Sequence, residues 1–230
     1  MSLPAHLSAD HATGFIPGET IAQYELGTMR NFIYLILDDA TKSAAIVDPQ
    51  KDLLPVTDLE MNGYRLTAIL LTHSHHDHVA GVGPLLAARP ELPVYVHEGD
   101  VFRLKNVPVK NLRRVQDGER FRIGEIEIEA LHSPGHSPGE ICYRVASARG
   151  PHYLLTGDTL FIRDCGRTDF PESDNDAMFD TLQRLKRLPD ELVVLPGHHY
   201  ARETASLLGT EKKSSPPLQC RSAEELASLP

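Results

Sequence analysis

The chain has 230 residues, of which 41% are hydrophobic and 24% charged, and this composition is ordinary for a globular protein. The formal net charge is −9 and no basic stripe stands out, which argues against a nucleic-acid partner. No apolar run approaches the roughly 20 residues that cross a membrane, and the first ten residues lack the pattern of a secretory signal.

The first half of the chain predicts strands that alternate with helices. Residues 1–20 predict a loosely attached lead-in, followed by strands at 32–37 and 44–47 around the polar turn Asp38-Asp39. Further elements are expected as helices at 53–61 and 79–89 and as strands at 68–71 and 94–96.

The second half continues this pattern. Alternation of apolar and polar residues from Arg120 to Ala130 predicts a hairpin, and a long amphipathic helix is expected over 174–188. The remaining expected elements are strands at 141–145, 153–155 and 192–195, a last helix at 201–208, and a tail at 211–230 that begins as loop. Strands alternating with helices fit an α/β class, and we expect a single domain over 1–230.

One loop carries the strongest chemical signal. The sequence Thr72-His73-Ser74-His75-His76-Asp77-His78 follows the apolar run at 68–71 directly. Neutral imidazole and carboxylate suit Zn(II) and Fe(II). Histidines gathered by chance on a solvated loop are the alternative for this segment taken alone.

Three further segments repeat the same order of apolar strand, Gly or Pro turn, and candidate ligand. They end in His136, Asp158 and His198. A strand holds a side chain rigidly and a turn exposes it, which suits a preorganised site. Any one of these residues is explained as well by a capping or turn role, but the four segments together predict a metal site.

These segments resemble the motifs of the metallo-β-lactamase superfamily, T-H-x-H-x-D-H followed by His, Asp and His in order. The resemblance covers about residues 31–208. It implies a four-layer α/β/β/α sandwich with the metal site along the top of the two sheets.

The resemblance supports two functional interpretations. In the first, as in the thioester hydrolase glyoxalase II, two Zn(II) ions bind, one to His73, His75 and His136 and the other to Asp77, His78 and His198, with Asp158 bridging. In the second, as in persulfide dioxygenases, one Fe(II) binds to His73, His136 and Asp158 and leaves positions open for dioxygen and a substrate sulfur. His75, Asp77, His78 and His198 would then orient the ligands or a bound water.

The segment after Asp158 favours the second interpretation. Residues 165–170 read Cys-Gly-Arg-Thr-Asp-Phe, which is similar to a stretch that recurs in persulfide dioxygenases. Glyoxalase II carries basic and aromatic glutathione contacts there and a C-terminal helical extension, whereas only 32 residues follow His198 here. We therefore expect a dioxygenase with one Fe(II) per chain that oxidises a glutathione-type persulfide to sulfite, with the thioester hydrolase as the alternative.

Arg167 and Asp77 are the residues expected to act in catalysis or substrate binding. The Arg167 guanidinium suits a substrate carboxylate, and its alternative is a structural ion pair with Asp164 or Asp169. Arg163 has the same two interpretations. The partner is expected to be a small thiol or persulfide, whose carrier the sequence leaves open among glutathione, coenzyme A and other thiols; a homodimer is also left open.

Four other residues near the motifs have weaker assignments. His76 and His199 are expected to face solvent or to orient ligands rather than to bind metal, and Tyr200 to line the pocket or to pack as an ordinary tyrosine. Cys165 is expected to be a small buried residue in a turn rather than a redox centre. The three cysteines cannot all pair within one chain, so we expect a reducing cytoplasm.

Overall fold

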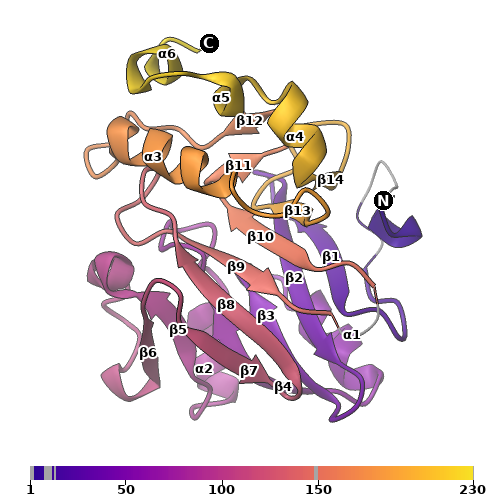
Figure 1. Ribbon diagram of the computed structural model, residues 1–230. Helices are drawn as coiled ribbons and strands as arrows, with labels where there is room; N and C mark the ends of the chain where they lie inside the picture. The colour runs from indigo at the N-terminus through magenta and orange to yellow at the C-terminus, as the bar shows by residue number, and fades with distance from the viewer. Residues whose placement is uncertain (1–2, 8–11, 13, 148–149, 230) are drawn as a thin grey trace.

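Two six-stranded sheets pack face to face in the computed structural model, which describes residues 3–7, 12, 14–147 and 150–229 (Figure 1). The first sheet has the order β1 (Ile21–Leu26), β2 (Asn31–Asp38), β3 (Ser43–Val47), β4 (Arg65–Leu70), β5 (Val94–His97) and β6 (Leu112–Val115). Strands β1 to β3 pair antiparallel, and β3 to β6 pair parallel. The parallel strands are joined through α1 (Leu54–Met61), α2 (Val82–Ala88) and the 3-10 helices η2 (Glu98–Arg103) and η3 (Val109–Asn111).

The second sheet has the order β14 (Ser206–Leu207), β13 (Val193–Pro196), β10 (Tyr153–Gly157), β9 (Ile141–Val145), β8 (Ile126–His132) and β7 (Arg120–Ile123). Only β10 and β13 pair parallel in it. A small ribbon, β11 (Leu160–Phe161) with β12 (Asp164–Cys165), follows β10. The later helices are α3 (Asn175–Leu185), α4 (Leu208–Ser214), α5 (Pro216–Gln219) and α6 (Ala223–Ala227).

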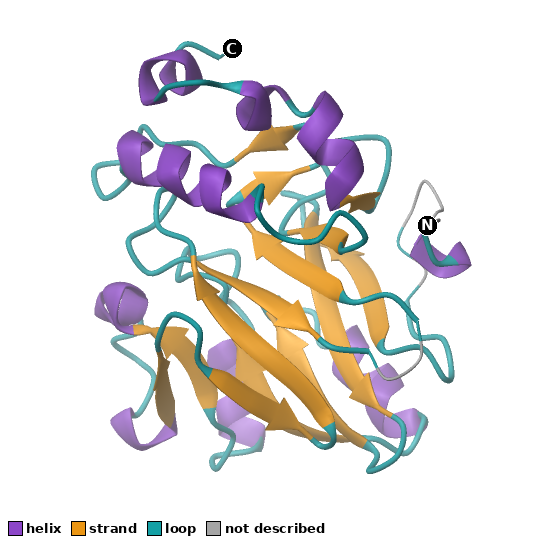
Figure 2. Ribbon diagram, in the orientation of Figure 1, coloured by secondary structure: helices purple, strands orange, loops and turns teal. Residues whose placement is uncertain are grey.

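Three separate apolar interfaces define four layers. Phe32, Tyr143 and Leu195 belong to the cluster between the sheets. A second cluster packs α1 and α2 on the outer face of the first sheet, and a third packs α3 to α6 on the outer face of the second. Helices therefore lie outside both sheets (Figure 2), and the architecture is the α/β/β/α sandwich that the sequence predicted.

The topology brings the candidate ligands to one rim of the sandwich. The carboxyl ends of β4, β10 and β13 and the turn between β8 and β9 meet there. Backbone bonds join the segments at this rim: the N–H of Phe32 donates to Gly197 O at 2.8 Å, and that of Ile141 to Thr72 O at 2.8 Å. The rim is thus held by both sheets rather than by one loop.

Several predicted elements differ from the observed ones. The predicted helix at 201–208 is wrong, because residues 206–207 pair with Val193 and Val194 as an edge strand and the helix begins only at Leu208. The helix predicted at 79–89 starts only at Val82, and the N–H of Gly81 donates to Pro49 O at 2.7 Å instead of to a carbonyl of a preceding helical turn. Strands β1 and β6 were not predicted.

Both ends of the chain are more ordered than the sequence suggested. The predicted lead-in contains the 3-10 helix η1 (Ala5–Leu7), and Leu7 is buried in the core between the sheets; residues 1–2, 8–11 and 13 of this stretch lie outside the described residues. The tail expected to begin as loop is helical to Ser214 and again from Pro216, and Leu218 and Leu226 bury against the second sheet's outer layer. Among the described residues no helix has the length and apolarity that a bilayer crossing needs.

Candidate metal centre

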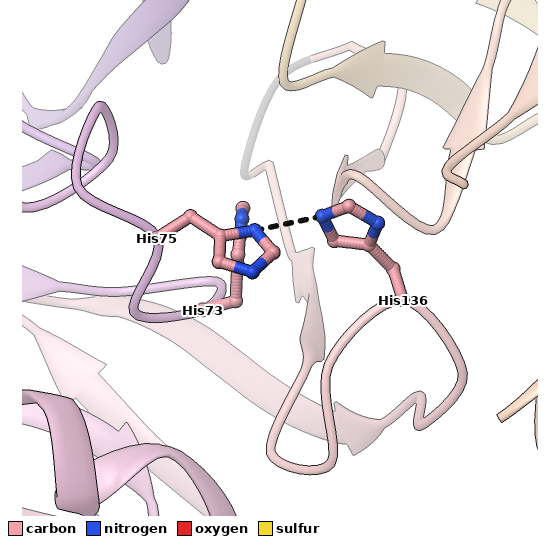
Figure 3. Close-up of side chains that lie close together, drawn as sticks. All are labelled: His73, His75 and His136. Atoms are coloured by element: carbon pink, nitrogen blue, oxygen red, sulfur yellow. Dashed lines mark hydrogen bonds between the residues drawn. The ribbon is translucent and has the colours of Figure 1, made fainter. Parts of the chain in front are cut away.

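Two groups of potential metal ligands lie side by side at the rim. His73, His75 and His136 form one group, and their closest ring nitrogens, His75 Nδ1 and His136 Nε2, are 2.9 Å apart across the gap between their loops (Figure 3). The loop after β4 supplies the first two residues and the turn between β8 and β9 supplies the third. All three ligand atoms fall within 4.8 Å of one another.

The second group contains Asp77, His78 and His198. The Nε2 atoms of His78 and His198 are 3.1 Å apart, and they lie 3.4 and 3.5 Å from Asp77 Oδ2. Asp158 borders both groups: its Oδ1 is 3.5 Å from His78 Nε2, and its Oδ2 is 3.5 Å from His136 Nε2 and 3.4 Å from His198 Nε2. The seven residues predicted as ligands are therefore all brought together.

The spacing of these atoms fits shared metal ions. Ligand atoms about 2.0–2.1 Å from a tetrahedral ion lie about 3.3 Å from one another. The second group matches this with separations of 3.1–3.5 Å, and the His75 Nδ1–His136 Nε2 distance of the first group is shorter, at 2.9 Å. Among the described residues, His73 Nε2 and Asp158 Oδ1 are buried without a hydrogen-bond partner. Buried polar atoms are rarely left in that state, and an ion at the centre satisfies both. The arrangement is that of a metal-binding site.

Four histidines point Nε2 into the site, and the Nδ1 atom on the outer side of each ring contacts another protein group. His78 Nδ1 bonds Asp48 Oδ2 at 2.9 Å, His136 Nδ1 bonds Arg167 O at 2.8 Å, and His198 Nδ1 bonds Met29 O at 2.9 Å. His73 Nδ1 lies 3.1 Å from the Thr72 hydroxyl. Such outer contacts fix the tautomer and the ring orientation of a metal-binding histidine.

The charges of the site suit a cation. Burial, reinforced by the neighbouring imidazoles, holds the pKa of His73 well below its usual range, and burial also lowers the pKa of His136. Burial opposes ionisation of Asp158, but His78 and the other imidazoles outweigh it and hold the pKa of that carboxyl well below its usual range. Burial likewise opposes the charge on His78, yet the carboxylates of Asp158 and Asp48 raise its pKa to about 9. A metal ion bound at this site would take the place of the proton that Asp158 and Asp48 otherwise stabilise on His78.

Asp100, which the sequence analysis did not single out, ties two ligand loops together. Its Oδ2 accepts from the N–H of Ser74 at 2.6 Å and its Oδ1 from that of Gly139 at 2.7 Å. Ser74 stands between two candidate ligands, and Gly139 is three residues past His136. A Cβ on Gly139 would meet Asp100 N at 2.4 Å, so the two loops pack at backbone distance. No short motif marks Asp100, because its role depends on segments far apart in the sequence.

Two more supporting residues were also missed. Glu140, fully buried, accepts the N–H of Asp158 at 2.8 Å, and Asn31 Nδ2 donates to Asp77 Oδ2 at 2.8 Å. The position of Glu140 next to the Pro-Gly turn after His136 is the only signal that the sequence offered. Both residues hold candidate ligand side chains or their backbone in place.

A cavity of about 460 Å³ opens beside the two ligand groups. Its wall combines apolar and charged side chains, namely Met29, Phe161, Phe170, Tyr200, Arg103, Arg167 and Glu172. The Tyr200 ring stacks on the His198 ring with centroids 4.7 Å apart, while 55% of Tyr200 stays exposed. Tyr200 thus lines the pocket rather than packing in the core.

Arg167 forms one of the structural ion pairs considered for it and also borders the cavity. Its guanidinium makes a two-fold contact with Asp169, Nε to Oδ1 at 2.8 Å and Nη2 to Oδ2 at 2.7 Å, and lies over the Phe170 ring at 4.8 Å. It also borders the cavity, with 68% of its side chain exposed. The carboxylate of Asp164 instead accepts the N–H of Cys165.

The other residues with weaker assignments fall outside the ligand groups. His76 is 87% exposed, as expected, whereas His199 is buried with Nδ1 2.6 Å from Glu25 Oε2. Arg163 pairs with Glu203. Burial raises the pKa of the Cys165 thiol to about 12, which agrees with a packing role because the reactive thiolate is not formed near neutral pH.

Comparisons with known proteins agree with this geometry. The family model described as Metallo-beta-lactamase superfamily matches residues 30–198. A probable hydroxyacylglutathione hydrolase (glo2) of Schizosaccharomyces pombe is 38% identical over 80% of this chain and 70% of its own length. A probable polyketide biosynthesis zinc-dependent hydrolase (BaeB) of Bacillus velezensis is 32% identical over 86% of both chains.

The crystal structure of ETHE1 from Myxococcus xanthus superposes with a TM-score of 0.78 at 30% identity, covering 91% of this chain and 92% of that one. The chain belongs to the metallo-β-lactamase superfamily.

Proposed function

We propose that this protein is a two-metal hydrolase that cleaves the thioester of a small thiol carrier such as glutathione. The observation that carries the proposal is the completeness of the second ligand group. Asp77, His78 and His198 hold their facing atoms 3.1–3.5 Å apart. A site for a single ion on His73, His136 and Asp158 does not require that spacing.

The residues of the chain have separable roles in this proposal. Two ions held by these residues would lower the pKa of a bound water and stabilise negative charge at the thioester carbonyl oxygen. Asp158, which borders both ligand groups, would help to hold the ions, and Asp77, which borders the cavity, is the carboxylate that we assign to hold the proton of the attacking water. The apolar wall of Phe161 and Tyr200 keeps water from the reacting group, and Arg167, which is paired with Asp169 but largely exposed at the mouth, is placed to meet a carboxylate of the thiol carrier.

The relatives support the same choice of chemistry. Two relatives, 38% and 32% identical to this chain, are named as a probable hydroxyacylglutathione hydrolase and a probable polyketide biosynthesis zinc-dependent hydrolase. The substrate class, a hydroxyacyl thioester of glutathione, is carried over from the first of these names.

A second candidate is the persulfide dioxygenase that the sequence favoured. It is supported by the structural likeness to ETHE1 over nearly the full length of both chains and by the Cys165–Phe170 segment. In this alternative one Fe(II) is held by His73, His136 and Asp158, and the second ligand group only orients them.

One comparison separates the two candidates. Zinc-loaded protein is tested for hydrolysis of S-lactoylglutathione, and iron-loaded protein for oxygen uptake with glutathione persulfide. We expect hydrolysis with zinc, its loss in His198→Ala, and no oxygen uptake beyond that of the metal alone. Oxygen uptake with sulfite release, without thioester hydrolysis, would make the dioxygenase the correct function.

A further inference from the structure

His75 is held differently from the other histidines of the site. The other four present Nε2, and backbone carbonyls, a hydroxyl or a buried carboxylate hold their Nδ1 atoms. His75 presents Nδ1 to the site, so its Nε2 points outward, where it lies 3.2 Å from Glu172 Oε1. Its side chain is 15% exposed, against 5% or less for the other four. His75 therefore lacks the buried support of its neighbours.

Glu172 comes from a loop that is itself fastened to the opposite ligand. Residues 166–174 join β12 to α3, and the Ser173 hydroxyl donates to His136 O at 2.6 Å while the N–H of Asp174 donates to Gly135 O at 2.8 Å. The Phe170 ring of the same loop lies edge-on to the rings of His75 and His136. The backbone of Glu172 is thus placed relative to His136, and its side chain reaches across to His75.

Arg103 fixes the carboxylate from the other side. It stands at the end of η2, and its guanidinium bonds the same Oε1 of Glu172 that faces His75. Arg103 and Glu172 both line the cavity. A free carboxylate at that position would compete for a metal ion, and the contact with Arg103 keeps it turned toward the imidazole instead.

We propose that Glu172, held by Arg103, is the positioning residue for His75 and fixes its tautomer so that the Nδ1 lone pair faces the metal site. A carboxylate that accepts the Nε2–H leaves Nδ1 unprotonated, which is the form that binds a metal. In the opposite tautomer the Nδ1–H points into the site and excludes an ion. The inference rests on the proposed two-metal site and names the support of one of its ligands.

Metal affinity tests this inference without reference to catalysis. Stepwise Zn(II) affinities of the full chain are measured by competition with a chromophoric chelator, and Co(II) absorption reports the ligand geometry. In Glu172→Ala we expect one of the two affinities to fall about ten- to a hundredfold, the range for removal of such outer partners, with the other unchanged. Glu172→Gln should recover part of the loss, because its amide oxygen still accepts the Nε2–H.

The matched control is Glu98→Ala on η2, the 3-10 helix that carries Arg103; it removes the surface pair with Arg114 and should leave both affinities at the wild-type value. Two wild-type affinities in Glu172→Ala would overturn the inference, as would equal loss at both positions with a lower melting temperature of the metal-free protein. A wild-type chain that binds one ion would instead overturn the two-metal proposal. The inference is then decided by whether Glu172→Ala weakens the binding of that single ion and Glu98→Ala does not.

Discussion

At the scale of single residues, the candidate site depends on outer partners as much as on the ligands. The histidines and aspartates were predictable because each follows an apolar strand and a turn in one recognisable order. Asp100, Glu140 and Asn31 were not, because their contacts join segments between 18 and 46 residues apart and carry no local pattern. The candidate ligands can therefore be predicted from the sequence more readily than the residues that hold them in place.

Arg167→Ala should impair substrate binding more than stability. The pair with Asp169 is largely exposed, and exposed pairs contribute little to folding. We expect the melting temperature to stay near that of the wild type, while KM for a glutathione thioester rises roughly tenfold or more from the lost charge-assisted contact. Arg167→Lys should recover only part of this, since an ammonium lacks the two-fold geometry. A clear fall in melting temperature with KM unchanged would instead assign Arg167 to structure.

Asp100→Asn should weaken metal binding as well as folding. The amide can accept only one of the two backbone N–H groups, so one buried donor is left unpaired at a cost of about 1–3 kcal/mol of unfolding free energy. Because those donors belong to two ligand loops, Zn(II) affinity should fall too. Asn111→Leu is the control: it removes two bonds to the carbonyls of Pro90 and Leu92, before β5 rather than after it. Equal loss of stability in both variants with Zn(II) affinity intact in both would contradict a role for Asp100 at the site.

At the scale of elements, the strands were predictable and the connections were not. Apolar runs and alternation indicated most strands of both sheets, and the helix of residues 175–185 shows the expected buried stripe of Met178, Leu182 and Leu185. Within the helix predicted at 201–208, residues 206–207 form an edge strand because tertiary pairing with β13 outweighs local helix propensity. Short tail helices escaped prediction because they are stabilised by burial against the second sheet's outer layer.

The turn after β2 should make stability depend on acid pH. Burial opposes the charge on Asp38, but the Thr41 hydroxyl and the N–H groups of Glu125 and Ala40 outweigh it and lower the pKa of Asp38. A lowered folded-state pKa means that this stabilisation is present above about pH 4, the unfolded value, and disappears as the pH falls through the folded value. The melting temperature of Asp38→Asn should therefore lie below that of the wild type at pH 7, and the gap should close in acid. A gap that is constant from pH 7 to pH 2 would contradict this account.

At the scale of the whole molecule, the sandwich fold brings the segments that carry the candidate ligands together at one rim. The family and the four-layer fold could be read from the motif order, since few folds place His, Asp and His after successive strands. The choice between two ions and one could not, because the same seven residues serve both. The number of bound ions therefore has to be measured.

The direct test of the central claim is the number of metal ions that each chain holds. Protein purified without added metal, and the same protein after zinc loading, is analysed for zinc and iron by mass spectrometry. We expect two ions per chain after loading, and one in Asp77→Ala, which removes a ligand of the second group only. A single iron per chain that added zinc does not supplement, with Asp77→Ala unchanged, would contradict the two-metal account.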